Sequence, residues 1–430
     1  MRRVLFISPH FPPDSSAGTH RVRLLAPHMA AHGWEPTVLT VDPRDYEGRL
    51  DPALEASVPR DLRVIRARAS SAAVTRAFGI GDLGLRAYRG LKREAHALLS
   101  RERFDAVFIT IYPTYPALLG PSLKRAYRVA FVLDYQDPWV GEWGRSVGPA
   151  AEGRPDLKSR ASRWIAAHLE PRALSAADGV TAVSHETYEQ ALARTPSAHP
   201  RVTAELPIGW DRRDLEFIPA TPYAFADAGC LHLSYVGTLL PAGFDTLRAL
   251  FSALAARRAH DPALTRVRLD FFGTSNLRSA DAAPRVLPVA AEYGLTDVVT
   301  EHAPRLDYFD ALAVLRASHG VLLLGSRERH YTPSKVFPAL LVERPVFAVI
   351  HEASNAATLL QQIGSAPSIR TVTYGASGVA SRVEEIGAAL SALAADPRYV
   401  AGAIDARALQ PTSACALAGK LADVLNRCAA

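Results

Sequence analysis

Apolar segments of strand length, each followed by a loop and a helical pattern, recur along this sequence. The clearest runs from Gly320 to Leu324, ends in Gly325-Ser326, and leads through a polar loop and a helix to a second apolar run, Val346 to Ile350. An unbroken apolar run of this length indicates a strand buried on both faces of a parallel sheet. Such sheets present a pocket for an anionic ligand where a strand meets the next helix N-terminus. An ordinary crossover with a solvated loop would give the same pattern, because fold periodicity does not specify function.

The alternation of strand and helix starts twice, which indicates two domains. It first runs through a strand over Val4 to Ser8, a helix over His20 to His32 and a strand over Glu35 to Val41, and it restarts at Leu231 to Val236 after a proline-rich stretch. A chain of 430 residues is also too long for a single core. We predict an N-terminal Rossmann-like domain over 1–218, a linker over 219–228, a second such domain over 229–410 and a final helix over 411–430.

Composition is that of a globular protein, with 48% apolar and 21% charged residues. The apolar runs are far shorter than the roughly 20 residues of a membrane span, and Val4 to Ile7 is too short for the core of a signal peptide. Three cysteines without ligand spacing are typical of reduced thiols, so we expect a cytoplasmic protein.

Positive charge is concentrated in residues 60–103, which hold eleven Lys and Arg against four acidic residues, a difference of +7. Within this segment, Leu83 to Leu99 places basic and apolar residues at helical spacing. Such a helix either packs on the sheet with a solvated face or contacts an anionic substrate or the inner face of a membrane. Nucleic acid is excluded as a partner, because no binding motif is present and no aromatic residues are interleaved for stacking.

Two acidic residues, Asp134 and Asp137, lie at the end of the strand expected over Val129 to Asp134, where open α/β sheets bind ligands. We expect Asp137, rather than Asp134, to face the bound ligand. Asp137-Pro138 also suits a helix N-cap, and the two roles are compatible. Tyr112 and Tyr115 follow another strand and would form a platform for a sugar or an apolar acceptor, or pack in the core.

Three segments together resemble the retaining GT-B glycosyltransferases of the family 4 type. They are FISPHFPPDSSAGTHRVRLL with HGWEPTVLT at the start, DYQDPW at 134–139, and PSKVF followed by ERPV at 333–346. The resemblance covers nearly the whole chain in order. It implies an α/β fold of the GT-B type, in which two Rossmann-like domains face a cleft and a C-terminal helix crosses back to the first domain.

The resemblance also assigns site positions. Those implied for the nucleotide-sugar donor are Gly18, Gly237, Thr238, Gly273, Arg327, His330, Tyr331, Ser334, Lys335 and Glu352. Those implied for the acceptor are Tyr112, Tyr115, Asp134 and Trp139, and those for catalysis are Asp137 and His20.

The donor segment departs from the family pattern. The family's two acidic positions fall on His330 and Pro338, and the loop GTLLPAG lacks the usual Arg and Lys. Diphosphate binding is therefore predicted at the backbone N–H groups of Gly237 and Thr238, at Lys335 and at Arg327 or Arg329, a set that is physically sufficient. Glu352 is the nearest acid to replace the ribose-binding glutamate.

The function implied is a retaining, metal-independent, hexosyltransferase-like enzyme. Its co-substrate is a nucleotide-diphospho-sugar, UDP-sugar first among them, with no other cofactor, and its acceptor is a glycan, a lipid-linked molecule or a small molecule. Two alternatives stay open. One is a nucleotide-sugar epimerase of the same fold, and the other is a non-catalytic partner that stabilises an active transferase.

Overall fold

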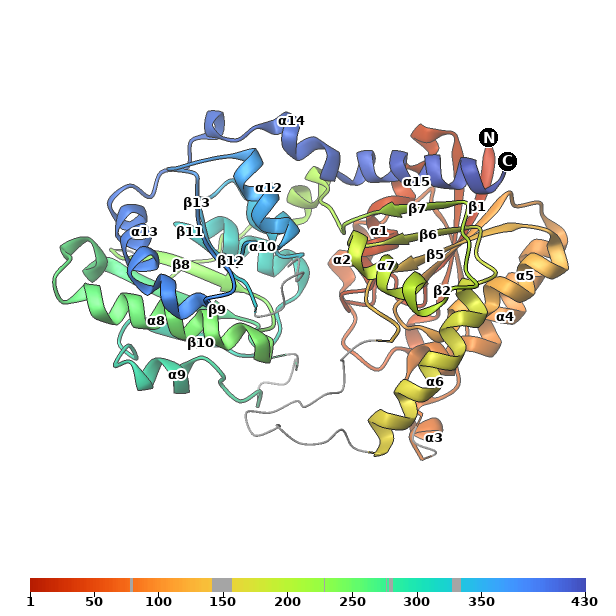
Figure 1. Ribbon diagram of the computed structural model, residues 1–430, viewed down its shortest axis with the longest axis horizontal. Helices are drawn as coiled ribbons and strands as arrows, with labels where there is room; N and C mark the ends of the chain where they lie inside the picture. Colours follow the sequence, from red (N-terminus) through yellow and green to blue (C-terminus); the bar gives the residue numbers. More distant parts are fainter. Residues whose placement is uncertain (78–79, 141–156, 228, 276, 278–280, 327–333) are drawn as a thin grey trace. The chain divides into compact units, whose positions relative to one another are not determined.

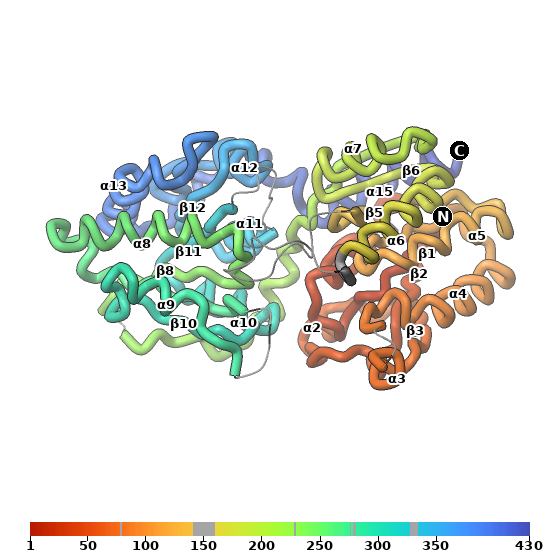
Figure 2. The backbone as a smooth tube through the Cα atoms, turned by 60° about the horizontal axis from the view of Figure 1, so that its bottom comes forward, coloured from red at the N-terminus to blue at the C-terminus, as the bar shows by residue number. Residues whose placement is uncertain are grey.

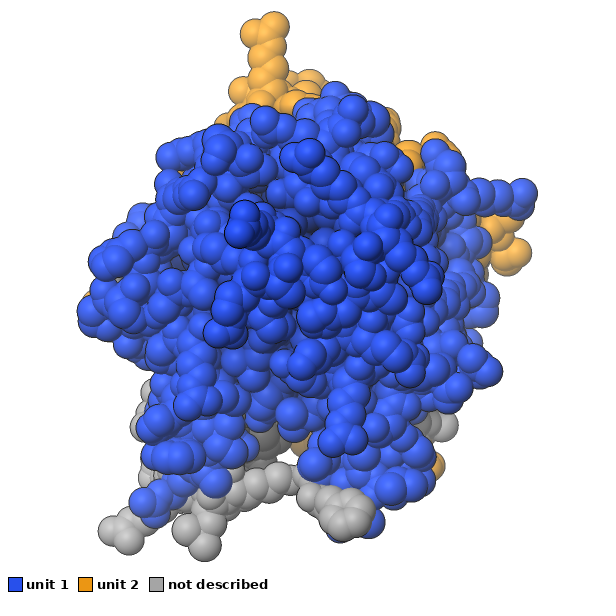
Figure 3. Space-filling view, turned by 90° about the vertical axis from the view of Figure 1, so that its right-hand side faces the viewer, with its two compact units in different colours: residues 1–211, 412–430 blue, residues 212–411 orange. Residues whose placement is uncertain are grey.

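The computed structural model describes the chain except residues 78–79, 141–156, 228, 276, 278–280 and 327–333, and the side chains of 157–159. Contacts divide it into two compact units, drawn in Figure 1 and coloured separately in Figure 3. Unit 1 comprises residues 1–211 and 412–430, and unit 2 comprises residues 212–411. The stretch 219–228 therefore belongs to unit 2, and the chain returns to unit 1 at its end.

Unit 1 is built on a seven-stranded parallel sheet in the order β3-β2-β1-β4-β5-β6-β7. Its strands are β1 (Arg2–Ile7), β2 (Trp34–Val41), β3 (Arg63–Ala67), β4 (Ala106–Ile111), β5 (Ala130–Tyr135), β6 (Gly179–Ala182) and β7 (Val202–Glu205). From β1 the chain builds outward to β3 and then returns to the other side of β1 at β4. The loops after β1 and β4 therefore diverge, which opens a crevice at their carboxyl ends.

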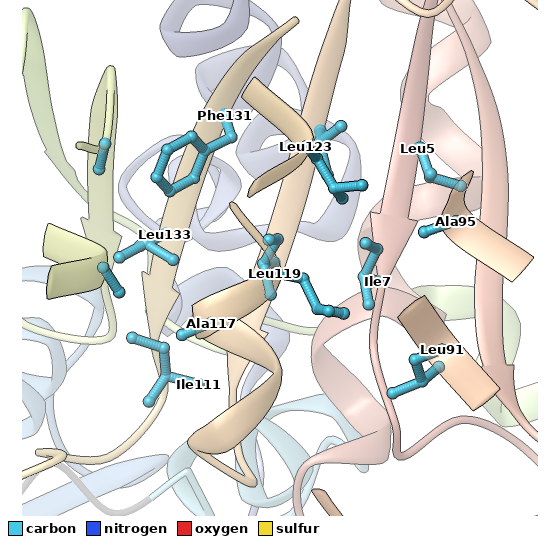
Figure 4. Close-up of a cluster of buried hydrophobic side chains, with 14 of the residues drawn as sticks. Leu5, Ile7, Leu91, Ala95, Ile111, Ala117, Leu119, Leu123, Phe131 and Leu133 are labelled. Atoms are coloured by element: carbon cyan, nitrogen blue, oxygen red, sulfur yellow. The ribbon is translucent and has the colours of Figure 1, made fainter. Parts of the chain in front are cut away.

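Helices cover both faces of this sheet. They are α1 (Thr19–Leu25), α2 (Pro52–Ala56), α3 (Ala72–Arg76), α4 (Leu83–Arg101), α5 (Leu119–Tyr127), α6 (Leu157–Leu174), α7 (His185–Arg194) and α15 (Ala414–Cys428). On one face, α4 and α5 place Leu91 and Leu123 against Leu5 of β1 and Phe131 of β5, all with no more than 1% exposure (Figure 4).

The opposite face is closed by α1, the 3₁₀ segment Ala26–His32 and α15. Leu417, Leu421 and Leu425 of α15 lie in one buried cluster with Val22 and Met29. Figure 1 shows α15 running along the sheet of unit 1. The predicted return of the C-terminal helix to the first domain is thus confirmed.

Unit 2 is built on a six-stranded parallel sheet in the order β10-β9-β8-β11-β12-β13. Its strands are β8 (Leu231–Val236), β9 (Val267–Phe272), β10 (Val299–His302), β11 (Gly320–Leu324), β12 (Val346–His351) and β13 (Ile369–Tyr374). The strand order reverses between β8 and β11, as it does between β1 and β4 in unit 1.

The helices of unit 2 are α8 (Phe244–Arg258), α9 (Leu287–Glu292), α10 (Tyr308–Ala317), α11 (Val336–Leu341), α12 (Asn355–Ile363), α13 (Val383–Ala395) and α14 (Ala406–Leu409). Figures 1 and 2 show α8 and α13 side by side over one face of the sheet. Leu250 and Phe251 of α8 and Leu390 of α13 are fully buried there against Phe347.

The predicted helix starts and ends were less accurate than the strands. The helix expected over His20 to His32 is α-helical only to Leu25, because Pro27 lacks the N–H that an α-helix needs. Pro171 lies inside α6, and the helix nevertheless continues to Leu174. Ala173 and Leu174 are fully buried, and their packing offsets the one hydrogen bond that Pro171 loses.

The basic segment 60–103 is largely neutralised by ion pairs. Seven of its eleven cations are paired with acids, three of which lie before the segment in sequence and one of which lies just after it. The pairs are Arg63–Glu102, Arg66–Glu55, Arg68–Asp45, Arg76–Glu47, Arg86–Glu47, Arg93–Glu94 and Arg103–Asp105. The exposed pairs among them contribute little to stability, and all of the pairs reduce the charge offered to a partner.

Truncating one leucine of α15 should destabilise unit 1. Leu421 is fully buried, so Leu421→Ala should lower the free energy of unfolding by about 2–5 kcal/mol. All five tryptophans of the sequence lie in residues 1–211, so tryptophan fluorescence during urea unfolding reports on unit 1 alone. Asp423→Ala, on the exposed face of the same helix, is the control and should change the value little. Equal stability of the two variants would mean that α15 does not close the core.

Candidate functional site

The clearest candidate site lies at the centre of the sheet of unit 2, where the loops after the neighbouring strands β8 and β11 lead in opposite directions. The loop after β8 begins with Gly237, whose φ of +118° suits only glycine. The side chain of Lys335, from the start of α11, lies directly over it. A Cβ atom at position 237 would stand 2.6 Å from Lys335 Cε. Glycine is therefore needed for the backbone conformation and for the approach of the lysine.

Lys335 is held at this crevice by neutral oxygen atoms. Its ammonium donates to the carbonyl oxygen of Thr238 at 2.7 Å and to the hydroxyl of Tyr235, and it lies 4.3 Å from the centroid of the Tyr235 ring. Burial lowers the pKa of Lys335 to about 7, and the positive charge of Arg305 acts in the same direction. None of its described hydrogen-bond partners is a carboxylate, so the protonated amine is not neutralised by an ion pair and can bind an anionic ligand.

The backbone around Lys335 offers one N–H group instead of the two predicted. The N–H of Gly237 donates to Phe272 O at 2.8 Å, so it is engaged within the protein. The N–H of Thr238 has no acceptor among the described residues, and Thr238 is partly exposed. Of this predicted pair, only Thr238 presents an N–H group to a ligand.

The loop after β9 supports the same crevice. Gly273 has a φ of +66°, and a Cβ atom there would lie 3.7 Å from the Cα of Gly237. The next residue, Thr274, is buried and donates to Glu301 at 2.5 Å. Glu301 also accepts hydrogen bonds from the backbone N–H groups that open α9. The predicted donor residues Gly237, Thr238, Gly273 and Lys335 thus lie together.

The remaining donor predictions are placed differently. Glu352 is exposed after β12, and its carboxylate lies over Gly375, where a Cβ atom would stand 2.2 Å from Oε1. Ser334 is exposed beside Lys335. Arg327, His330 and Tyr331 lie outside the described residues. The position of the family glutamate, Pro338, lies inside α11 and supplies no polar side chain.

In unit 1 the corresponding crevice lies between the loops after β1 and β4. Gly18, at the N-terminus of α1, is covered by the ring of Tyr112, which follows β4. A Cβ atom at position 18 would stand 2.3 Å from Tyr112 Cδ1, so only glycine allows this contact. Two residues that were predicted separately are therefore neighbours at the crevice of unit 1.

A polar network beside Tyr112 was not predicted. It is centred on the buried carboxylate of Asp14, which lies 2.7 Å from His10 Nδ1 and accepts hydrogen bonds from Ser16 Oγ at 2.5 Å and Thr19 Oγ1 at 3.0 Å. Burial raises the pKa of Asp14, but the His10 and hydroxyl contacts outweigh it and lower the pKa to about 2. The sequence signal was a histidine and an aspartate four residues apart in the loop after the first strand.

Two predicted acceptor residues are part of the folded interior. Asp134 lies 2.9 Å from Arg21 Nε with both side chains fully buried, and it accepts a hydrogen bond from Thr181 at 2.7 Å. Its carboxylate is fully buried, so neither oxygen can contact an acceptor substrate. Trp139 is 1% exposed and belongs to the core of unit 1. A sequence cannot distinguish these residues from surface residues, because burial depends on the packing of distant helices.

The other predictions for unit 1 lie at or near the surface. Asp137 is exposed, and the surrounding protein displaces enough water to raise the pKa of its carboxyl to about 6. Tyr115 is half-buried, and burial together with the charge of Asp82 raises the pKa of its phenol. His20 Nδ1 lies 3.2 Å from Arg23 Nη2. Because arginine only donates, this contact engages the lone pair of a neutral His20.

The described residues contain no group of three or more His, Cys, Asp or Glu side chains placed to hold a metal ion. Within the same part of the chain, none of the helices combines the length and the apolar character needed to cross a membrane.

Two Rossmann-like units, with a C-terminal helix that returns to the first, define a GT-B fold. Residues 17–205 match the family model described as "Glycosyl transferase 4-like domain", so the predicted resemblance to GT-B enzymes of the family 4 type is confirmed. No curated protein sequence matches this chain.

Solved structures of the same fold cover the chain from end to end. Sucrose-phosphate synthase from Thermosynechococcus elongatus is 17% identical over 99% of this chain and 98% of that chain, with a TM-score of 0.61. HepE from Anabaena, in complex with UDP-glucose, is 15% identical over 99% and 100%, with a TM-score of 0.59. A UDP-forming α,α-trehalose-phosphate synthase from Burkholderia xenovorans is 12% identical over 100% of both chains, with a TM-score of 0.60. At these identities the likeness shows the fold.

Removing the carboxylate of Asp134 should destabilise unit 1 without involving a ligand. Asp134→Ala leaves the guanidinium of Arg21 buried and unpaired, at a cost of about 3–5 kcal/mol in the free energy of unfolding. Replacing both partners, Arg21→Met with Asp134→Leu, should restore most of the loss. Arg44→Ala removes an exposed pair with Asp42 and should cost less than about 1 kcal/mol. Urea unfolding followed by tryptophan fluorescence measures all three, and a harmless Asp134→Ala would contradict the structural role.

Proposed function

We propose that this protein is a glycosyltransferase that moves a sugar from a nucleotide-diphospho-sugar, specifically a UDP-sugar, to an acceptor hydroxyl with retention at the anomeric carbon. The observation that carries the proposal is the placement of Lys335 over Gly237 at the strand-order reversal of unit 2. This is the position at which open α/β sheets bind nucleotides. The UDP and UDP-glucose complexes of HepE and the UDP-forming trehalose-phosphate synthase support the choice of uridine.

The donor diphosphate would bind at Thr238 N–H and Lys335. An ammonium in a partly buried site interacts more strongly with a phosphate than it would in water. When the bond between the sugar and the diphosphate breaks, negative charge grows on the leaving phosphate, and a fixed cation stabilises it. This arrangement needs no metal ion for the departure of the diphosphate. Gly273, at the adjacent strand end, leaves room beside Gly237 for the nucleoside.

The acceptor would bind to unit 1, with Asp137 in contact with its hydroxyl and the rings of Tyr112 and Tyr115 beside it. Its class, a glycan, a lipid-linked molecule or a small molecule, stays a prediction. Peripheral contact with the inner membrane face through residues 60–103 also stays a prediction. The seven ion pairs of that segment lower the charge that it offers to anionic lipids.

One observation favours the alternative of a non-catalytic partner. Pro338 stands inside α11 where the family has a ribose-binding glutamate, and Glu352 lies over Gly375. The alternatives differ in a simple measurement, because a working donor site binds UDP and a partner protein without one does not. An epimerase would require acids and histidines around the sugar, whereas the side chain of Lys335 contacts Tyr235, Thr238 and Gly237.

The first test is nucleotide binding by the wild-type protein and by Lys335→Ala. In a thermal-shift panel of UDP, GDP, ADP, CMP and TDP, UDP should raise the melting temperature most, since a ligand at a hundredfold excess over Kd adds about 2.7 kcal/mol. Lys335→Ala should lose a charged contact worth about 1.5–3 kcal/mol, which is a ten- to hundredfold loss of affinity for UDP in calorimetry. Affinity for uridine should stay within twofold.

Arg248→Ala is the matched control, because it removes an exposed cation of unit 2 that pairs with Glu292. It should leave the affinity for UDP unchanged. If Lys335→Ala weakens UDP and uridine equally, Lys335 does not contact the phosphates. If the wild-type protein binds none of the nucleotides, the transferase proposal is wrong and the non-catalytic alternative is favoured.

Asp137→Asn should reduce sugar transfer and leave donor binding intact. Loss of one charged hydrogen bond to the acceptor is worth about 1.5–3 kcal/mol, and UDP release from UDP-glucose in the presence of an acceptor measures it. The carboxyl of Asp137 has a raised pKa of about 6, so it is protonated at lower pH. The advantage of the wild-type enzyme over the variant should therefore shrink as pH falls below 6. A variant with wild-type turnover at pH 8 would leave Asp137 without a role at the acceptor.

A further inference from the structure

The loop after β1 carries a histidine that faces the crevice of unit 1. The ring of His10 lies 5.3 Å from that of Tyr112 and stacks 6.4 Å from that of Tyr46. The hydroxyl of Tyr46 donates to the carbonyl oxygen of Pro9 at 2.8 Å, which ties the ring to the same loop. The imidazole is thus confined between two aromatic side chains, where α/β sheets place ligands.

The hydrogen bonds of His10 fix which nitrogen carries its proton. Nδ1 lies 2.7 Å from a carboxylate oxygen of Asp14 and 2.8 Å from Ser16 Oγ. Ser16 Oγ already donates to Asp14, and an ionised carboxylate only accepts. Nδ1 must therefore be the donor, and a neutral His10 has its lone pair on Nε2.

The hydrogen bonds of Asp14 favour its ionised form and hold the imidazole of His10 in this orientation. Besides His10, its carboxylate accepts from the hydroxyls of Ser16 and Thr19 and from the backbone N–H of Ser16 at 3.3 Å. The side chain of Asp14 is 10% exposed and that of His10 is 15% exposed. A buried carboxylate that holds an imidazole by Nδ1 is the arrangement that positions a proton acceptor.

Nε2 of His10 has no hydrogen-bond partner among the described residues. The side chain of His10 is 15% exposed, and Nε2 is not among the described buried polar atoms that lack a partner. Burial raises the pKa of Asp82, the N-cap of α4, and a positive charge on His10 acts in the opposite direction. The imidazole is anchored on one side and available on the other.

We propose that His10 is a catalytic residue of unit 1 and that its Nε2 takes the proton of the acceptor hydroxyl during sugar transfer. This inference rests on the transferase function proposed above. In the step, the hydroxyl oxygen forms a bond to the anomeric carbon, and the bond from that carbon to the diphosphate oxygen breaks. The electron pair leaves with the nucleoside diphosphate, the proton passes to Nε2, and water then removes it. Asp14 is the positioning residue.

The chain offers a matched pair for the test. His28 lies 2.7 Å from Asp211, the same separation as in the pair of His10 and Asp14, and both histidines are partly buried in unit 1. The nitrogen of His28 in that contact is Nε2, and His28 lies in the 3₁₀ segment after α1 rather than at the crevice. Replacing each histidine by glutamine therefore removes a similar ion pair, but only His10→Gln removes an imidazole from the loop after β1.

The experiment measures UDP release from UDP-glucose by the full chain, with water or added sugars as acceptor, together with UDP affinity by calorimetry. His10→Gln should lower kcat at least about a hundredfold, with Kd for UDP within twofold of wild type. His28→Gln should keep kcat within threefold. Added imidazole should restore part of the turnover of His10→Ala, and Asp14→Asn should lower kcat while UDP binding persists.

A measurement without turnover completes the test. Nitrogen-15 NMR of histidine side chains in the free protein should show His10 protonated at Nδ1, and Asp14→Asn should perturb that signal. The inference is overturned if His10 is protonated at Nε2, if His10→Gln retains turnover within threefold of wild type, or if it loses turnover only in step with UDP affinity. In those outcomes wild-type UDP binding still supports the proposed transferase. Failure of the wild-type protein to bind any nucleotide overturns both.

Discussion

Reversal of the strand order at the centre of each sheet is the constraint on which both candidate sites depend. In unit 1 the chain leaves β1 in one direction and β4 in the other, and in unit 2 it does the same at β8 and β11. When the loops after two adjacent parallel strands lead in opposite directions, a crevice stays open at the carboxyl ends of those strands. Gly18 and Tyr112 occupy that opening in one unit, and Gly237 and Lys335 occupy it in the other.

The two openings carry charged groups of opposite sign, a cation in unit 2 and carboxylates in unit 1. The opening of unit 2 holds a cation among neutral oxygens, with Arg305 close enough to lower the pKa of Lys335. The opening of unit 1 holds carboxylates, with Asp14 kept ionised by its hydrogen-bond donors. Under the proposed function, a phosphate would suit the first opening. The hydroxyl groups of an acceptor would suit the second, since carboxylates and an imidazole lone pair accept their protons.

The sequence predicted the strands and the glycines well, because both depend on residues that are adjacent in the sequence. The apolar runs at Leu231–Val236 and Gly320–Leu324 coincide with β8 and β11, and Gly237 is required by its own backbone angle. Asp134 was misread because its partner, Arg21, is distant in sequence and only packing brings them together. His10 was missed because its chemistry depends on which of its nitrogens Asp14 engages, and a loop sequence does not show that.

The return of α15 to unit 1 has a consequence for synthesis of the chain. Residues 1–211 are made first, but one face of their sheet is covered by Leu417, Leu421 and Leu425, which are made last. Unit 2, residues 212–411, is continuous in sequence and can close as soon as it is made. Domains generally fold as they emerge during synthesis. The first unit made is thus the last completed, and its apolar face stays open to chaperones, or to other chains, until the final helix arrives.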